Sequence, residues 1–202
     1  MKKTLSILLT VCCLQAMAQS DYQNEIITWQ KELNESFKDP ETSPLTEKEI
    51  KKFKGLAYYP INEDLRIVAK LERLSNEIPF TMPTSSQKEK VFVHYAIAHF
   101  MIEGKQYKFP LYQSLQIQQT EEYADYLFAP FTDLTSAITS YGGGRYIDLK
   151  IPEGDTVVID FNKAYNPSCA YSPNYNCPIP PRENDLALEV KAGVMTWEND
   201  SN

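Results

Sequence analysis

Basic residues are scarce in this chain of 202 residues. It carries 20 lysines and arginines against 27 aspartates and glutamates, which gives a formal net charge of −7 at pH 7. A protein that binds nucleic acid or an anionic membrane surface needs a basic patch, so this balance argues against both kinds of partner. An acidic excess of this size is typical of a soluble protein whose copies repel one another.

Sequence motifs for several common chemistries are absent. The chain has no H-E-x-x-H zinc motif, no EF-hand loop, no G-x-S-x-G nucleophile elbow and no lysine placed for a phosphate-binding loop. Only two histidines are present, His94 and His99, and their odd spacing on one expected strand directs them to opposite faces of a sheet. We therefore expect no bound metal and no other cofactor.

Long apolar runs are confined to the N-terminus. Lys2 and Lys3 precede an apolar stretch over residues 5–17 that ends in an A-x-A pattern. This order is typical of a secretory signal peptide, and the stretch is too short to span a membrane as a helix. We expect residues 1–18 to be removed near Ala18–Gln19 and the mature protein to be exported, to the periplasm or as a secreted protein, without a membrane span.

Cysteine is also scarce, at four residues. Cys12 and Cys13 lie in the apolar stretch and would permit a lipid anchor, but Val11 is a poor residue before a lipoprotein cysteine. Cys169 and Cys177 remain as an even pair, joined by a loop rich in turn-forming residues, so we expect a disulfide. The alternatives are two buried free thiols, or metal or redox chemistry, although the spacing is not C-x-x-C.

The pattern after the signal is first helical and then alternating. From residue 21 to 38, apolar residues recur every three or four positions and predict a helix. T-E-K-E at 46–49 is a capping box for a short second helix that Gly55 would close. After Tyr58 the alternation predicts strands. The expected strands cover residues 66–74, 91–102, 107–117, 126–131, 145–149, 156–161 and 186–191, with a hairpin turn at 103–105.

Short connections between these strands, with no helical pattern of ten residues between them, favour antiparallel pairing. We predict a mainly β (α+β) fold, an antiparallel β-barrel or sandwich with the N-terminal helices packed against it. The expected organisation is a helical region over 19–55, a single β-rich domain over 56–197 and a frayed tail over 198–202.

Residues 160–184, DFNKAYNPSCAYSPNYNCPIPPREN, form the most unusual stretch. Its five prolines remove backbone donors and exclude a central strand, so we expect a rigid extended segment, here called the strap. Its tyrosine rings would lie on the sheet. A proline-rich peptide ligand at 178–182 is the less favoured interpretation.

Glycine is uncommon, and three of the seven glycines are consecutive. Gly142–Gly144 precede Arg145. Successive amides in such a turn can bind an anion, and a guanidinium suits a carboxylate or phosphate. The alternative is a hairpin turn in which Arg145 pairs with Asp148, Asp160 or Glu183.

Long stretches of the sequence resemble a known family. LFAPFTDLTSAITSYGGGRYIDL at 127–149, the strap, LALEVKAGV at 186–194 and GLAYYP at 55–60 are similar to the family named domain of unknown function 1684. The family pattern usually closes with Ala-Gly-Glu, whereas Val194 stands in the glutamate position here. The resemblance implies a single domain and brings no established activity.

We expect a non-catalytic envelope protein that binds a small anionic ligand or a polymer between the glycine turn and the strap. The residues expected to bind it are Gly142, Gly143, Gly144, Arg145, Asn162 and Tyr165. One alternative is a hydrolase that uses two carboxylates as acid and base. The candidates for that role are Asp133, Asp148, Asp160 and Glu183. Another alternative is a purely structural or interaction domain. Asp160 and Asn162 would then only bond backbone groups where a strand enters the strap.

Overall fold

The structure, a computed structural model, describes residues 20–86 and 88–197. The predicted signal peptide and the predicted frayed tail lie outside the described residues. The chain divides into two compact units, residues 1–53 and 54–202. Within the described part, no helix is both long and apolar enough to cross a membrane.

The described part of the first unit is helical. Helix α1 is described over residues 20–36, and α2 covers Glu47–Ile50. Thr46 caps α2 as predicted, because its hydroxyl accepts from the Glu49 amide and the Glu49 carboxylate accepts from the Thr46 amide. The prediction that Gly55 closes this helix is wrong, since the helix ends at Ile50 and its C-cap is Lys51.

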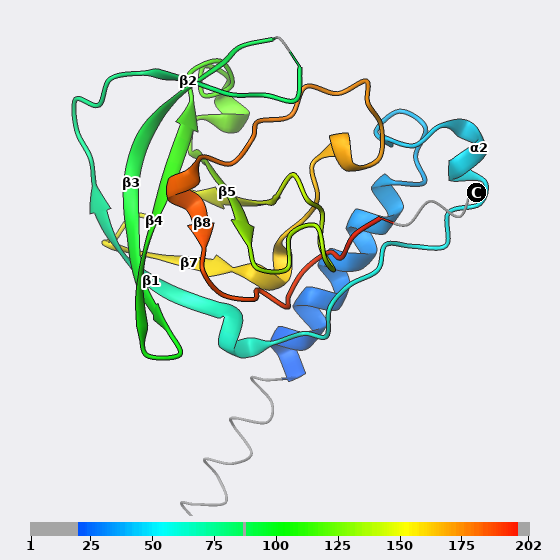
Figure 1. Cartoon of the computed structure of the whole chain (residues 1–202), viewed down its shortest axis with the longest axis horizontal. Helices are drawn as coiled ribbons and strands as arrows, with labels where there is room; N and C mark the ends of the chain where they lie inside the picture. Colours follow the sequence, from blue (N-terminus) through cyan, green and yellow to red (C-terminus); the bar gives the residue numbers. More distant parts are fainter. Residues whose placement is uncertain (1–19, 87, 198–202) are drawn as a thin grey trace, which may run out of the picture. The chain divides into compact units, whose positions relative to one another are not determined.

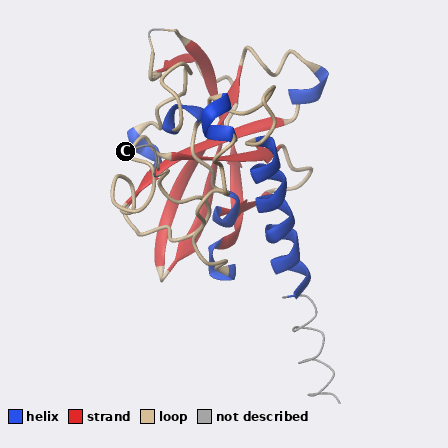
Figure 2. Ribbon diagram, turned by 90° about the vertical axis from the view of Figure 1, so that its right-hand side faces the viewer, coloured by secondary structure: helices blue, strands red, loops and turns tan. Residues whose placement is uncertain are grey.

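The second unit is built on one eight-stranded sheet (Figures 1 and 2). The strand order is β6-β5-β4-β3-β1-β7, with β2 paired to β3 and β8 paired to β5. Every pair is antiparallel except β5–β8. The predicted mainly β fold is confirmed. The strands are β1 (Arg66–Arg73), β2 (Phe80–Met82), β3 (Lys90–Ile102), β4 (Lys105–Ser114), β5 (Tyr126–Asp133), β6 (Arg145–Lys150), β7 (Thr156–Asp160) and β8 (Asp185–Leu186).

The sheet is curled into a half-barrel. β6 and β7 stand at the two ends of the six-strand order, yet only residues 151–155 join them. Five residues span at most about 20 Å, so the two ends of the sheet approach each other. No ladder pairs β6 with β7. The described strands therefore form a single curled sheet, neither a closed barrel nor a two-layer sandwich.

Both faces of this sheet carry buried side chains. The core face holds a large apolar cluster built from alternate residues of six strands, Leu127 and Ala129 of β5 among them. The opposite face, here called the strap face because strap residues pack on it, holds a smaller cluster. Its buried members are Met82, Phe92, Tyr112, Phe128 and Tyr146.

A β-bulge in β3 changes which residues share a face. His94 lies opposite Tyr112, and His99 lies opposite Lys108, with the register shift falling at Tyr95. Opposed residues share a face, and the two partners are four positions apart on β4, so both histidines lie on the strap face. The prediction of opposite faces is wrong because the extra residue of the bulge reverses the alternation.

The strap is irregular and forms no strand beyond Asp160, as its prolines predict. It is not extended throughout, because it contains three short 3₁₀ helices, Phe161–Lys163, Ser168–Ala170 and Arg182–Asn184. It begins in the core with Phe161 and pairs with the free edge of β6 through a bridge between Tyr165 and Tyr146. It then continues over the strap face. A disulfide joins Cys169 and Cys177, whose Cα atoms are 6.2 Å apart, which confirms the predicted bridge.

The predicted strand over 186–191 is largely wrong. Only Asp185–Leu186 form β8, and the chain beyond, red in Figure 1, continues as an extended segment without a ladder. We call residues 186–194 the closing segment. The alternation that suggested a strand is real, because every second side chain is buried. The buried residues are Leu186, Leu188, Val190, Ala192 and Val194.

Removing the disulfide should lower stability and leave the fold intact. The bridge closes a loop of eight sequence positions, and the chain-entropy model assigns such a loop about 2–3 kcal/mol of stabilisation. We expect the double variant Cys169→Ser, Cys177→Ser to lose this amount in urea unfolding followed by tryptophan fluorescence. Reaction of both Cys169 and Cys177 with a thiol reagent in the unfolded, unreduced wild-type protein, located by peptide mapping, would contradict the bridge.

Candidate functional site

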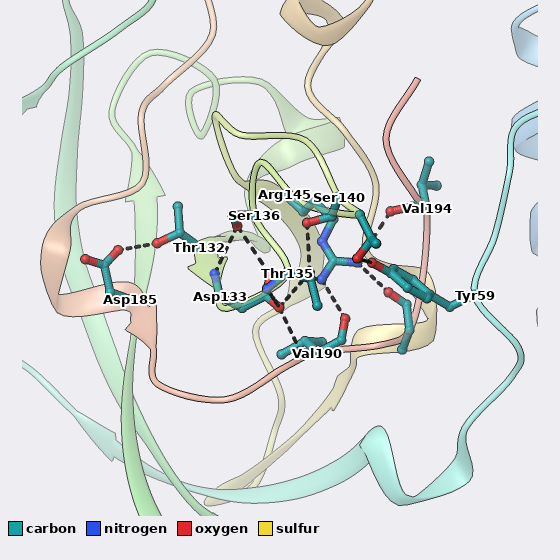
Figure 3. A network of polar contacts seen from close by, with 12 residues as sticks. Tyr59, Thr132, Asp133, Thr135, Ser136, Ser140, Arg145, Asp185, Val190 and Val194 are labelled. Atoms are coloured by element: carbon teal, nitrogen blue, oxygen red, sulfur yellow. Dashed lines mark hydrogen bonds and ion pairs between the residues drawn. The ribbon is translucent and has the colours of Figure 1, made fainter. Parts of the chain in front are cut away.

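Arg145 lies where the closing segment meets the sheet (Figure 3). It begins β6 on the core face, and its side chain is fully buried. Nη2 donates to Asp133 Oδ1 at 3.1 Å and to the Val190 carbonyl at 2.8 Å, and Nη1 donates to the Ala192 carbonyl. One guanidinium therefore links β5, β6 and the closing segment.

Asp133, the partner carboxylate, is buried as well. Its Oδ2 accepts hydrogen bonds from the Val190 amide at 2.8 Å and from the Thr135 amide and hydroxyl at 3.1 and 2.8 Å. Burial lowers the pKa of the Arg145 guanidinium, and the Asp133 carboxylate opposes that shift. Arginine stays protonated in proteins, so the pair is buried as two opposite charges. The partner is Asp133, and not one of the three acids considered from the sequence.

The glycine turn serves close packing within the protein. A Cβ at Gly143 would lie 2.4 Å from the ring of its near neighbour Tyr141, and Gly144 approaches more distant parts of the chain. Gly144 has a φ of +85°, and a Cβ there would lie 2.6 Å from the Phe131 carbonyl oxygen and 2.7 Å from Pro180 Cγ. Gly142 and Gly143 are exposed. The close approach at Gly144 is therefore between two parts of the chain itself.

Asp160 and Asn162 bond backbone groups at the start of the strap. Asp160 caps the short helix Phe161–Lys163 and accepts from the Asn162 amide at 3.0 Å. The side chain of Asn162 accepts from the Asn62 amide and donates to the Asn62 carbonyl, both at 2.8 Å. These contacts are the structural role considered for the two residues from the sequence.

Glu183 fixes the end of the strap to β3 and β4. Its Oε1 accepts a hydrogen bond from the Tyr112 hydroxyl at 2.6 Å and lies 2.7 Å from His94 Nε2. Burial raises the pKa of this carboxyl, but the hydrogen bonds from Tyr112 and His94 outweigh burial and hold the pKa below its usual value. The carboxylate is therefore stabilised in its ionised form.

The strap face contains a cavity of about 420 Å³, a volume typical of sites for small organic molecules. Five aromatic side chains line it: Phe92, Tyr126, Phe128, Tyr146 and Tyr165. Several of these rings pack edge to face. Ring centroids are 4.7 Å apart between Phe128 and Tyr146 and 5.9 Å apart between Tyr146 and Tyr165. The aromatic lining is thus held in place by its own packing.

The strap forms one wall of this cavity through Asn176 and Pro178. The Pro178 carbonyl accepts a hydrogen bond from the Tyr146 hydroxyl. Asn176 accepts from the Ser86 hydroxyl at 2.6 Å and donates to the Lys88 carbonyl at 3.2 Å. These contacts hold the wall to the sheet and to the loop before β3.

Asp148 lies beside the cavity. Its Oδ1 accepts hydrogen bonds from the hydroxyls of Tyr126 at 2.7 Å and Tyr165 at 2.8 Å, while its Oδ2 bonds to no described residue. Burial raises the pKa of the Asp148 carboxyl, and the two hydrogen bonds reduce that shift. The residue as a whole is exposed, so the carboxylate is crowded by rings on one side and open to solvent on the other.

Lysines stand at the β3 side of the cavity. Lys88 and Lys90 both line it, together with the exposed Glu89. Lys90 is half-buried, and burial lowers the pKa of its ammonium. This ammonium forms no ion pair with any residue of the described ranges. Because β4 and β5 separate β3 from β6, Lys90 and Asp148 stand at opposite sides of the cavity.

The residues considered from the sequence are thus divided among several places. Of the expected ligand-binding residues, Tyr165 lines the cavity, and of the four candidate carboxylates, Asp148 lies beside it. Each of the four carboxylates is held by different partners in the hydrogen bonds given above. Phe128 and Lys90 were missed. The sequence contained a signal for Phe128, because residues 126–131 are apolar on both faces of the strand. A strand with one face in solvent alternates apolar and polar residues, so this pattern indicates that both faces are covered.

The chain belongs to the DUF1684 family of proteins of unknown function, whose family model matches residues 51–195. It is similar to an uncharacterized protein of Haloarcula marismortui whose structure was solved by NMR in solution. The two sequences are 30% identical, the match covers 89% of this chain and 97% of that chain, and the TM-score is 0.68. A comparison with curated proteins finds no match. The resemblance noted in the sequence is confirmed, and it brings no activity.

Neutralising Asp133 should destabilise the fold strongly. Asp133→Asn keeps the shape of the side chain but leaves the buried charge of Arg145 without a counter-charge. Breaking a buried pair in this way costs about 3–5 kcal/mol. Asp155→Asn, at an exposed position, is the matched control and should change the free energy of unfolding by less than about 0.5 kcal/mol. Equal losses in urea unfolding would contradict the role given to the pair.

The contribution of Glu183 should depend on pH. Its pKa in the folded state lies below the unfolded value of about 4.5, so the stabilisation is present above that pH and is lost as pH falls through the lowered value. We expect Glu183→Gln to have a lower melting temperature than wild type at pH 7. The loss in free energy of unfolding should be less than about 1 kcal/mol, because the Glu183 side chain is half-exposed. The two melting temperatures should converge as the pH falls below about 4.5 and through the lowered pKa of Glu183. A gap of constant size in thermal melts followed by circular dichroism would contradict this.

Proposed function

We propose that the protein is a non-catalytic binding protein for a small organic anion with an aromatic or apolar body. The ligand binds in the cavity on the strap face. The observation that carries this proposal is the cavity itself, about 420 Å³ in volume and lined by five aromatic side chains. A preformed apolar cavity with a few fixed polar groups is the usual form of a small-molecule site.

The negative charge of the ligand follows from Lys90. The partly buried ammonium of Lys90 forms no ion pair with a described residue, so an anion that enters beside it stabilises its charged form. Lys88 adds a second positive charge on the same side of the cavity and Glu89 a negative one, which leaves a net positive charge there. Lys90 therefore takes the anion-binding role first considered for Arg145, whose guanidinium is fully buried and bonded within the core.

The arrangement of acids favours binding over hydrolysis. Hydrolysis by paired carboxylates requires two of them within reach of one substrate. Asp148 lies beside the cavity, whereas Asp133 is on the core face with Arg145 and Asp160 caps the start of the strap. Glu183 is bonded to His94 and Tyr112 and is not among the residues that line the cavity.

We also propose that the protein acts after export, in the periplasm or as a secreted protein. The N-terminal sequence supports export, and the disulfide between Cys169 and Cys177 suits an oxidising compartment. Sequencing the N-terminus of the protein recovered outside the cytoplasm tests this. A start near Gln19 supports it, and an intact N-terminus in the cytoplasm contradicts it.

Replacing Lys90 should weaken the binding of aromatic anions. Phenyl phosphate and benzoate serve as probes, with uncharged benzyl alcohol as their counterpart. We expect Lys90→Gln to raise the Kd of both anions about three- to tenfold, because a half-exposed ion pair is lost, and to leave benzyl alcohol unchanged. Titrations followed by ligand-observed NMR give these constants.

Lys70→Gln is the matched control. It makes the same charge change at an exposed position of β1 that does not line the cavity. Equal losses in the two variants would show a general charge effect and contradict the role of Lys90. Failure of wild-type protein to bind any of the three probes would overturn the proposed function.

A further inference from the structure

The carboxylate of Asp148 has no positive partner among the residues that the structure describes. Its Oδ1 accepts from two tyrosine hydroxyls, and none of the described lysines, arginines or histidines forms an ion pair with it. Lys150, two positions further on the same strand, pairs instead with Asp125 at 3.2 Å. The negative charge beside the cavity is therefore available to a ligand.

Aromatic rings surround this charge. Tyr126 and Tyr165 bond to the carboxylate, and Phe128 lies opposite Asp148 in the β5–β6 register. Tyr146 packs against both Phe128 and Tyr165. Since the hydroxyls of the three tyrosines are occupied by protein acceptors, their rings are the surfaces that these residues offer to a ligand. Aromatic rings gathered around a carboxylate are the combination that binds organic ammonium groups.

We propose that the ligand is a zwitterion whose ammonium group binds among Tyr126, Tyr146 and Tyr165 beside Asp148. Its anionic group binds at Lys90, so this inference rests on the proposed function and adds a second, opposite charge to the ligand. A cation at this place would also favour the ionised form of a carboxyl that burial disfavours.

The separation of the two protein charges sets the shape of the ligand. Lys90 begins β3 and Asp148 lies on β6, with β4 and β5 between them. Three strand spacings correspond to about 14 Å between backbones across the sheet. The register places Asp148 level with His94, four residues from Lys90, which adds about 13 Å along the strands. The two side chains cover part of this separation. The ammonium and the anion therefore stand at opposite ends of an apolar body, and not on one carbon atom.

Three small probes of one shape test this inference. 4-(Aminomethyl)benzoate carries both charges at opposite ends of a ring, 4-methylbenzoate carries only the anion, and 4-methylbenzylamine carries only the cation. We expect wild-type protein to bind the zwitterion at least about fivefold more tightly than 4-methylbenzoate. A partly desolvated cation site of this kind contributes about that much.

Asp148→Asn is the decisive variant. Its side chain keeps an oxygen that accepts from Tyr126 and Tyr165, and the position is exposed, so the fold is preserved. We expect the preference for the zwitterion to disappear while the Kd of 4-methylbenzoate stays within about twofold. Asp155→Asn, the matched control, should keep the preference. Lys90→Gln should weaken the binding of the zwitterion and of 4-methylbenzoate by the same factor.

The possible failures are distinct. If wild-type protein binds 4-methylbenzoate and the zwitterion equally well, or if Asp148→Asn keeps the preference, the inference is overturned and the proposed function stands. If none of the three probes binds wild-type protein, the proposed function itself is overturned.

Discussion

The buried ion pair between Asp133 and Arg145 is the contact on which the second unit depends. It joins the end of β5, the start of β6 and the closing segment, whose carbonyls at Val190 and Ala192 have no strand as a partner. Two buried charges are stable only when most of their hydrogen-bonding groups are satisfied, and here backbone groups of the closing segment do this. The core face is therefore completed by an extended chain that has no ladder. Asp133 and Arg145 hold it together with separate backbone hydrogen bonds, such as the one from the Leu134 amide to the Leu188 carbonyl at 2.9 Å.

The same pair also positions the cavity on the other face. Successive residues of a strand point to opposite faces, so Arg145 on the core face places Tyr146 and Asp148 by alternation on the strap face. On β5, the Asp133 position likewise implies that Phe128 faces the strap. A slip of one residue in either strand would bury the cavity residues in the core and expose the ion pair. Core stability and the shape of the site are in this way determined by one register.

Local patterns were sufficient for much of this structure. The capping box at Thr46, the central strands and the strap followed from spacing, capping residues and prolines. What could not be predicted depends on contacts distant in sequence. The bulge at Tyr95 moves the residues after it to the other face of the sheet, and no local sequence pattern marks it. The closing segment shows the same alternation of buried and exposed residues whether its backbone bonds to a strand or to Arg145. The cavity combines residues from four strands and the strap, so only the register brings them together.

The most direct test of the site is a map of amide chemical shifts in the presence of a small aromatic anion. We would record ¹H–¹⁵N NMR spectra of the wild-type protein while adding phenyl phosphate. The cavity on the strap face predicts the largest changes at Lys90, Phe92 and Phe128, with a further change at Tyr165 in the strap. Changes concentrated at Gly142, Gly143 and Gly144 would contradict it, because they would place the anion at the glycine turn.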